Sequence, residues 1–207
     1  MAAHLFAVIA GFIVSTIKTF GYGGVVFLMA VESACIPLPS EIILPFAGYL
    51  VFMHQLQLLP VGIAGAFGCV IGSVIAYAIG AYGGRPLIEK YGKYVLISRH
   101  DLDMADRWFN RYGATIVFTG RLLPVVRTFI SLPAGISRMN FFKFIVYTFI
   151  GSFIWSLLIT WIGLKLGQQW DTLGPYFHRF DDVILIVGIA AFLLYLRRHL
   201  KHIAAER

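Results

Sequence analysis

The sequence has few charged residues for its length. Of its 207 residues, 13% are charged and 59% are hydrophobic, whereas a soluble globular protein carries roughly a quarter charged residues. A chain of this composition cannot cover its surface with charge. The scarcity therefore excludes a soluble domain of ordinary type and predicts a surface that faces lipid.

The chain is also poor in the residues that build disulfide frameworks and metal sites. Its two cysteines, Cys35 and Cys69, lie among apolar or small residues, and its six histidines show no ligand spacing. We interpret both cysteines as small core residues and expect neither a metal nor a cofactor. The N-terminus lacks the basic region and the small-residue cleavage site of a secretory signal peptide.

Long uncharged runs predict membrane-crossing helices. At about 1.5 Å rise per residue, about 20 residues cross a hydrocarbon core of about 30 Å. We predict transmembrane helices over residues 58–82 and 141–165, and a C-terminal one over 180–199, where a shorter run has charged flanks. Residues 1–20 show the apolar spacing of an N-terminal helix, which fits both a spanning helix and a helix on the bilayer surface.

The basic residues are unevenly distributed. Six Lys or Arg residues fall within 83–112 and four follow residue 196, whereas 53–60 has none and 168–182 has one. By the positive-inside rule, the first two regions are cytoplasmic. We therefore predict a cytoplasmic amphipathic connector over 83–112 and a cytoplasmic C-terminus. Because the basic residues flank membrane segments, we do not expect nucleic-acid binding.

One pattern occurs on both sides of the predicted connector. Each copy contains Tyr-Gly, an apolar stretch, a charge, a proline, a second charge and Ala-Gly, and a long uncharged helix follows. The copies begin at Tyr22 and Tyr112, and they match once short gaps are allowed, so chance similarity is the alternative. Because a single crossing separates them, they would enter the membrane from opposite faces, as in an inverted repeat.

Prolines interrupt both copies, between apolar stretches that are too short to cross a bilayer. Each proline removes a backbone donor and breaks the helical ladder; they are Pro37, Pro39, Pro124 and Pro133. We predict two re-entrant helical hairpins, over 21–53 and 113–137, whose tips lie in protein or line a wet cavity, since irregular backbone is not tolerated against lipid. The predicted fold is an all-α integral membrane protein, with one membrane domain over 1–207.

Four charged residues lie inside these apolar segments, at matching places in the two copies: Glu32, Glu41, Arg121 and Arg127. Such a charge costs at least about 2.5–3.5 kcal/mol on insertion scales, so four cost roughly 10–14 kcal/mol, comparable with the whole stability of a domain. Salt bridges that only pin the hairpins together are the structural alternative, but apolar packing would serve as well. We interpret the four residues as a transport site.

The two arginines suit an anionic lipid. Pro124 fits the first turn of a half-helix, which places Arg127 near free helix N–H groups. Guanidinium and N–H groups together form a phosphate cradle. Glu32 and Glu41 would be the counter-charges of the empty site, and a displaced carboxylate away from water favours its protonated form. This predicts that anion movement is coupled to protons.

Other conspicuous residues have structural interpretations. Gly62, Gly65, Gly68 and Gly72 are expected to be close-packing positions against a neighbouring helix. The aromatic residues expected to be mostly interfacial anchors are Trp155, Trp161 and Trp170, with Tyr147 and Tyr176.

The charged segments resemble motifs of the DedA family, which belongs to the SNARE-associated or VTT-domain superfamily. Residues 32–41 resemble its acidic motif, 118–127 with Ala134-Gly135 its arginine motif, and 77–85 its linking motif. The resemblance covers about residues 20–165. It implies a multi-pass protein of the bacterial inner membrane, with two re-entrant hairpins, that moves undecaprenyl phosphate across the bilayer.

The same resemblance implies that the two glutamates and two arginines are the functional residues. Some members of the family are associated with phosphatidylethanolamine, and several are linked to the proton-motive force. Some also have an aspartate in the proline loop, where this chain has Pro39-Ser-Glu41. The longer acid leaves the exact lipid open.

The residues leave other functions to be distinguished. A phosphatidylethanolamine or general phospholipid translocase or scramblase would use the same site. A proton-coupled exporter of small ions or drugs would bring cations to two fixed positive charges. A lipid phosphatase would need a nucleophile and an acid near the arginines, and a scaffold leaves the buried charges unexplained. We therefore expect a transporter, not an enzyme, whose partners are an anionic lipid and protons; homo-oligomers are left open.

Overall fold

The structure is a computed structural model that describes residues 2–36, 38–83 and 113–167. Throughout these ranges the chain forms helices joined by turns and loops, with no strand. The all-α prediction is therefore confirmed for this part of the chain. The predicted C-terminal helix over 180–199 and the connector beyond Gly83 lie outside the described residues.

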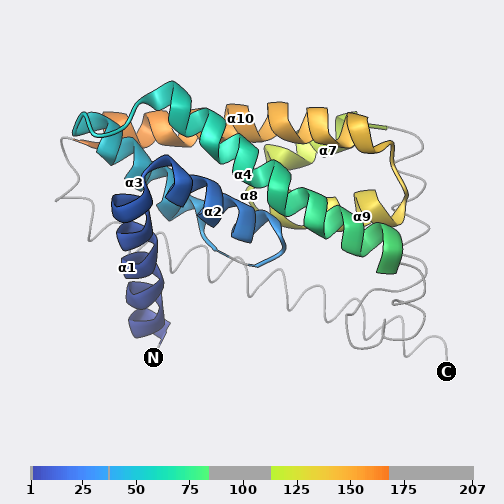
Figure 1. The fold of residues 1–207 in the computed structure, drawn as a ribbon, viewed down its shortest axis with the longest axis horizontal. Helices are drawn as coiled ribbons and strands as arrows, with labels where there is room; N and C mark the ends of the chain where they lie inside the picture. Colours follow the sequence, from blue (N-terminus) through green and yellow to red (C-terminus); the bar gives the residue numbers. More distant parts are fainter. Residues whose placement is uncertain (1, 37, 84–112, 168–207) are drawn as a thin grey trace. The chain divides into compact units, whose positions relative to one another are not determined.

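Two helical segments dominate the fold. The helices in chain order are α1 (Ala2–Phe20), α2 (Tyr22–Ser33), α3 (Ser40–Phe52), α4 (Leu58–Ala78) with its π-helical extension η1 (Ile79–Gly83), α7 (Thr115–Arg121), α8 (Pro124–Phe129), α9 (Ser131–Ile136) and α10 (Phe141–Lys165) (Figure 1). The segments Leu58–Gly83 and Phe141–Lys165, with 26 and 25 residues, are long and apolar enough to cross a membrane. They agree with the crossings predicted over 58–82 and 141–165.

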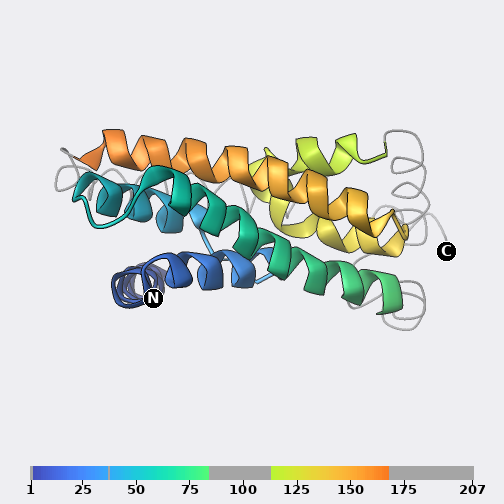
Figure 2. The same cartoon turned by 45° about the horizontal axis from the view of Figure 1, so that its top comes forward.

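The shorter helices pack around the α4–α10 pair. Helices α4 and α10 lie side by side in both ribbon views (Figures 1 and 2). Helix α2 contacts α4 and α3 contacts α10, while α9 contacts α4 and η1 and α7 contacts α10. Helix α1 packs on α2 and α3, and its Ile13 and Ile17 are fully buried. Both groups of short helices therefore flank the same two long helices.

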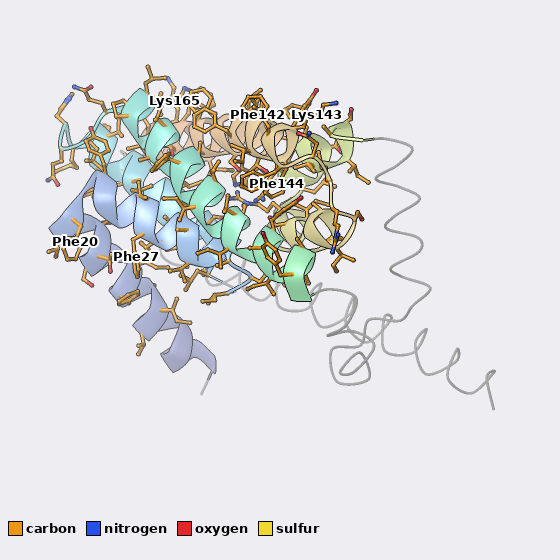
Figure 3. All side chains as sticks on the ribbon, turned by 45° about the vertical axis from the view of Figure 1, so that its right-hand side comes forward. Phe20, Phe27, Phe142, Lys143, Phe144 and Lys165 are labelled. Carbon is orange, nitrogen blue, oxygen red and sulfur yellow. The ribbon has the colours of Figure 1, made fainter. Side chains whose placement is uncertain are left out.

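Large apolar side chains cover the outer face of α4. They recur every four residues and so form a single row along the helix: Leu59, Ile63, Phe67, Ile71, Ile75 and Ile79. Phe20, Phe27 and Phe142 are exposed as well, whereas Phe144 is buried (Figure 3). Extended apolar surface of this kind marks contact with a membrane or a partner.

Glycines bring α3 and α10 into backbone contact. A Cβ atom added to Gly48 would lie 2.2 Å from the carbonyl oxygen of Thr160 on α10. One added to Gly163 would lie 2.3 Å from the carbonyl oxygen of Pro45 on α3. No side chain fits at either position, so only glycine allows this approach.

A second crossing, between α9 and the α4–η1 segment, repeats the pattern. A Cβ atom added to Gly135 would lie 2.1 Å from the carbonyl oxygen of Tyr77. One added to Gly80 would lie 2.4 Å from the carbonyl oxygen of Leu132. In both crossings, each glycine meets the residue three positions before the other glycine.

The glycines within α4 are packing positions, as predicted. Gly68 and Gly72 approach the backbone of α2, where added Cβ atoms would lie 2.3 Å and 2.0 Å from the carbonyl oxygens of Val26 and Ala30. This contact holds the last turn of α2, with Glu32, beside the middle of α4.

Candidate anion-binding site

Three of the four predicted site residues are buried in the described part of the chain. Arg121 is 0% exposed, Arg127 is 1% exposed and Glu32 is 3% exposed, whereas Glu41 is partly exposed. The two arginines are among the largest fully buried side chains of that part. A buried guanidinium is rare unless it is paired, so its partners decide what the site can do.

Local sequence places the arginines at helix boundaries. Arg121 is the last residue of α7. Helix α8 begins at Pro124, whose missing N–H is not needed in a first turn. The N–H of Arg127 then donates to the carbonyl oxygen of Leu123 at 3.0 Å. The predicted position of Pro124 at a helix start is therefore confirmed.

The other prolines lie at or near helix starts too. Pro39 directly precedes the first residue of α3. Pro133 is the third residue of α9, and because it has no N–H to donate to the carbonyl oxygen of Phe129, the helix is interrupted at Ile130, as a proline at this position predicts. Pro37 lies outside the described residues.

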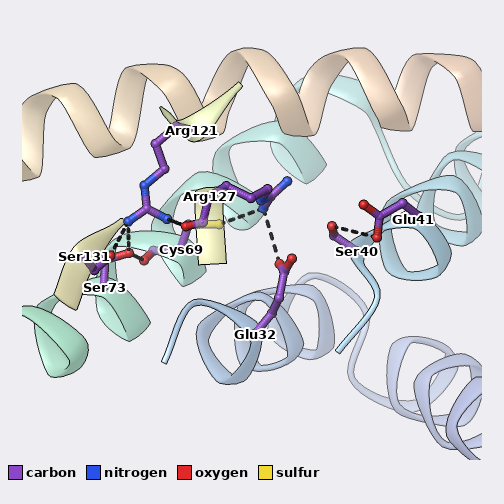
Figure 4. Close-up of polar contacts among 8 residues, drawn as sticks. All are labelled: Glu32, Ser40, Glu41, Cys69, Ser73, Arg121, Arg127 and Ser131. Carbon is purple, nitrogen blue, oxygen red and sulfur yellow. Dashed lines mark hydrogen bonds and ion pairs between the residues drawn. The ribbon is translucent and has the colours of Figure 1, made fainter. Parts of the chain in front are cut away.

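An ion pair joins Arg127 to Glu32. The Nη2 of Arg127 lies 3.3 Å from Oε2 of Glu32 (Figure 4). The same nitrogen donates to Sγ of Cys69 at 3.5 Å, and the guanidinium lies over the ring of Trp155, 5.1 Å from its centre. Its other terminal nitrogen, Nη1, is buried and has no acceptor within the described ranges. Of the two terminal nitrogens of Arg127, one therefore has hydrogen-bond acceptors and the other has none among the described residues.

Arg121 is held by neutral oxygens. Its Nη1 donates to the carbonyl oxygen of Arg127 at 2.9 Å, and its Nη2 donates to Oγ of Ser73 at 2.5 Å and to Oγ of Ser131 at 2.6 Å (Figure 4). The Nε of Arg121 is buried without an acceptor in the described segments. These bonds orient the guanidinium and leave its charge uncompensated.

Glu41 stands apart from the two arginines. It lies in the first turn of α3, and its Oε2 accepts a hydrogen bond from Oγ of Ser40 at 3.4 Å (Figure 4). The structure therefore brings Glu32, Arg127 and Arg121 together but does not join Glu41 to either arginine.

The buried cluster consequently carries an excess of positive charge. Arg121 and Arg127 supply two positive charges, and Glu32 supplies the one carboxylate in contact with them among the described residues. Buried donors without acceptors cost free energy, and more so when they are charged. An anion with several acceptor oxygens would balance the positive charge and accept from the unpaired donors. A pair of guanidinium groups can bind such an anion in bidentate fashion.

Sequence reasoning missed the neutral residues of the site. It interpreted Cys69 as a small core residue and did not single out Ser73 or Ser131. The interpretation of Trp155 as an interfacial anchor is wrong, since its side chain is buried under Arg127. The four-residue spacing of the hydroxyl residues on α10 was the available signal that this side of the helix faces the interior.

Comparison with known proteins adds the family context. A family model described as the VTT domain matches residues 38–165. The chain is 41% identical over 183 residues to undecaprenyl phosphate transporter A of Bacillus subtilis (strain 168), covering 88% of this chain and 90% of that protein. It is 32% identical over 188 residues to undecaprenyl phosphate transporter A of Staphylococcus aureus (strain NCTC 8325 / PS 47), covering 89% and 93%.

Another relative carries a different name. The chain is 30% identical over 187 residues to an alkaline phosphatase-like protein of Lactococcus lactis subsp. lactis (strain IL1403), covering 88% of this chain and 87% of that protein. No solved structure matches the chain.

Proposed function

The chain belongs to the VTT-domain family, the superfamily of the DedA proteins, and on this premise we propose that it is a bacterial membrane transporter that moves undecaprenyl phosphate across the bilayer. Two relatives that align over most of their length are named for that lipid. The exposed apolar row on α4 and the two membrane-length helices support a site within the bilayer. We place the protein in the inner membrane with a cytoplasmic C-terminus, following the distribution of basic residues.

The incomplete charge balance of the arginine cluster carries this proposal. Arg127 Nη1 and Arg121 Nε are buried donors without acceptors in the described segments, and one carboxylate faces two guanidinium groups. A phosphate group supplies the missing charge and accepts from both donors. A carboxylate would match the same deficit with one charge and two oxygens, so the choice of a phosphate rests on the relatives that are named for a phosphate lipid.

We further propose that the chain is an inverted repeat of two re-entrant hairpins. The two glycine crossings support this arrangement, because Gly48 meets Thr160 as Gly135 meets Tyr77, with reciprocal contacts at Gly163 and Gly80. Each hairpin would then pack its second arm on the crossing helix of the other repeat. Such repeats commonly place the substrate near the bilayer midplane.

Proton coupling is a separate proposal that rests on Glu32. An arriving phosphate competes with this carboxylate for Arg127, 3.3 Å away. A carboxylate that loses its counter-charge in a low-dielectric site is stabilised by taking up a proton. Substrate binding would thereby be linked to proton binding, and the effect of a pH gradient on transport measures the link.

Substitution of Arg127 by lysine tests the lipid-phosphate site. Lysine keeps the charge but loses the planar fork that binds two oxygens. We expect Arg127→Lys to slow transport at least about tenfold, the equivalent of one lost charge-assisted hydrogen bond. The measurement is the accessibility of a labelled undecaprenyl phosphate headgroup in proteoliposomes.

Arg138→Lys is the matched control, because Arg138 is exposed and outside the arginine cluster. We expect it to transport as the wild-type protein does. Equal rates for Arg127→Lys, Arg138→Lys and wild type would refute bidentate phosphate binding by Arg127.

The same proteoliposomes separate the remaining candidates. The relative named alkaline phosphatase-like protein makes hydrolysis the second candidate function. Release of inorganic phosphate from the lipid by the purified chain would identify an enzyme, whereas a moved but intact lipid identifies a transporter. Faster movement of labelled phosphatidylethanolamine than of undecaprenyl phosphate would replace the proposed substrate by a phospholipid.

A further inference from the structure

Helix α10 presents buried polar groups that have no hydrogen-bond partner within the described ranges. They lie on one side of the helix and are the hydroxyls of Thr148, Ser152, Ser156 and Thr160 and the indole N–H of Trp155. On other described helices, the hydroxyls of Thr16, Ser73 and Thr119 donate to the carbonyl oxygen four residues earlier. The α10 hydroxyls differ from these three.

Helix packing accounts for two of these hydroxyl residues. A Cβ atom added to Gly65 would lie 2.6 Å from Oγ of Ser156, so this side chain fills the space that the glycine leaves. Thr160 lies at the crossing with Gly48. Both residues therefore lie at helix–helix contacts whatever the protein binds.

Ser152 and Trp155 lie instead beside the two arginines. A Cβ atom added to Gly151 would lie 2.8 Å from Cβ of Arg121, which places that arginine against α10 next to Ser152. One helical turn further on, the ring of Trp155 lies under the guanidinium of Arg127. This turn of α10 thus forms a wall of the arginine cluster.

Four buried donors without acceptors among the described residues therefore belong to the arginine cluster and to the turn of α10 that packs against it. Two are charged, Arg121 Nε and Arg127 Nη1, and two are neutral, Ser152 Oγ and Trp155 Nε1. A buried donor that is left unpaired is costly, so a group that satisfies all four at once is strongly favoured over one that satisfies two.

We infer that Ser152 and Trp155 donate to the bound anion and select a phosphate monoester over a phosphate diester. This inference rests on the proposed function and names the substrate class of the same site. A monoester presents three unsubstituted oxygens and carries up to two negative charges, whereas a diester presents two such oxygens and carries one. With a monoester, three oxygens receive the four donors and only one oxygen accepts from two of them, whereas with a diester both free oxygens must accept from two donors each.

Two probes that differ in one methyl group test the inference. Farnesyl phosphate is a monoester and methyl farnesyl phosphate is the diester with the same tail. Binding of each is measured by calorimetry on the full-length chain in nanodiscs. We expect the wild-type chain to bind the monoester at least about tenfold more tightly, the worth of one charge-assisted hydrogen bond.

The variants Ser152→Ala and Trp155→Phe each remove one neutral donor. Phenylalanine keeps a ring under Arg127, so the loss of N–H is isolated from the loss of the ring. We expect both variants to lower the monoester-to-diester ratio severalfold. Ser156→Ala, the same chemical change one turn away, is expected to keep the wild-type ratio.

The outcomes distinguish this inference from the function on which it rests. Equal binding of both esters by wild type, or a ratio that Ser152→Ala and Trp155→Phe leave unchanged, overturns the selection of monoesters while transport of undecaprenyl phosphate continues. Failure of the wild-type chain to bind either ester or to move the lipid overturns the proposed function and this inference with it. Melting temperatures within a few degrees of wild type identify variants that are folded.

Discussion

At the scale of single residues, the contacts of Arg127 determine how a phosphate could replace Glu32 in the proposed site. Its guanidinium group contacts a carboxylate, a thiol and an aromatic ring, and its Nη1 has no acceptor among the described residues. A phosphate can therefore replace Glu32 as the anionic partner of Arg127, while the contacts of Arg127 with Cys69 and Trp155 remain. Such exchange is easier than the removal of the only partner of a buried charge, which costs about 3–5 kcal/mol.

Glu32→Gln tests the proposed proton link. Glutamine keeps the shape of the side chain and mimics its protonated form, so we expect transport that no longer responds to a pH gradient. We also expect lower thermal stability, since Arg127 loses its counter-charge, by about 3 kcal/mol. Glu41→Gln is the control for stability and should cost less, because Glu41 is partly exposed and not joined to an arginine. An unchanged response to the gradient in Glu32→Gln would contradict the link.

The identity of the buried charges could be predicted from sequence, but their pairing could not. Arg121 and Arg127 stand out because charges inside apolar segments are rare. Their partners depend on how helices distant in sequence pack against each other. Arg121 donates to the hydroxyls of Ser73 and Ser131 and not to a carboxylate of the described residues. Hydroxyls are common in membrane helices, so nothing in the sequence distinguishes these two from others.

At the scale of helices, the second predicted hairpin is more fragmented than the first. The first has one arm on each side of its loop, α2 and α3. The second contains three short helices, α7, α8 and α9, and it turns at Leu122–Leu123 and again near Ile130. The turn at Leu122–Leu123 lies between Arg121 and Arg127 and lets them meet, since the side chain of Arg121 donates to the carbonyl oxygen of Arg127.

A pair of alanine substitutions tests the helix crossings. Gly135→Ala places a Cβ atom 2.1 Å from the carbonyl oxygen of Tyr77, so we expect a loss of about 1–3 kcal/mol from forced separation of the helices. Gly23→Ala is the control, because a Cβ atom there meets nothing within 4 Å, and alanine stabilises a helix by up to about 1 kcal/mol. Thermal unfolding in detergent measures both. Equal melting temperatures for the two variants would show that the crossing tolerates a side chain.

Helix boundaries were predictable where chemistry marks them. The long helices follow from uncharged length, and Pro124 marks the start of α8. Pro133 likewise marks the interruption at Ile130, because its missing N–H leaves the carbonyl of Phe129 without its helical donor.

At the scale of the whole molecule, the described part is polar where two buried arginines meet and apolar on the outer row of α4. This distribution is the reverse of that in a water-soluble protein, whose charges lie outside. The proposed inverted repeat would put the loop before α4 and the start of α10 on opposite faces of the membrane, because one crossing separates them.

Cysteine labelling tests this sidedness. Gln55→Cys and Lys143→Cys place thiols at exposed positions before α4 and at the start of α10. On a Cys35→Ala background, in which the remaining Cys69 is fully buried, we expect a membrane-impermeant maleimide to label Gln55→Cys on intact cells. Lys143→Cys should react only after the membrane is permeabilised. Labelling of both from the same side would contradict the inverted arrangement.

The crossings of Gly48 with α10 and of Gly135 with α4 also govern the order of assembly during synthesis. When α3 leaves the ribosome, the backbone that Gly48 contacts has not yet been made, and more than a hundred residues must follow before it exists. Until α10 has been synthesised, the face of α3 that contains Gly48 therefore lacks its packing partner in the membrane. Anything that delays translation of α10 prolongs that exposure and leaves the nascent chain open to quality-control proteases.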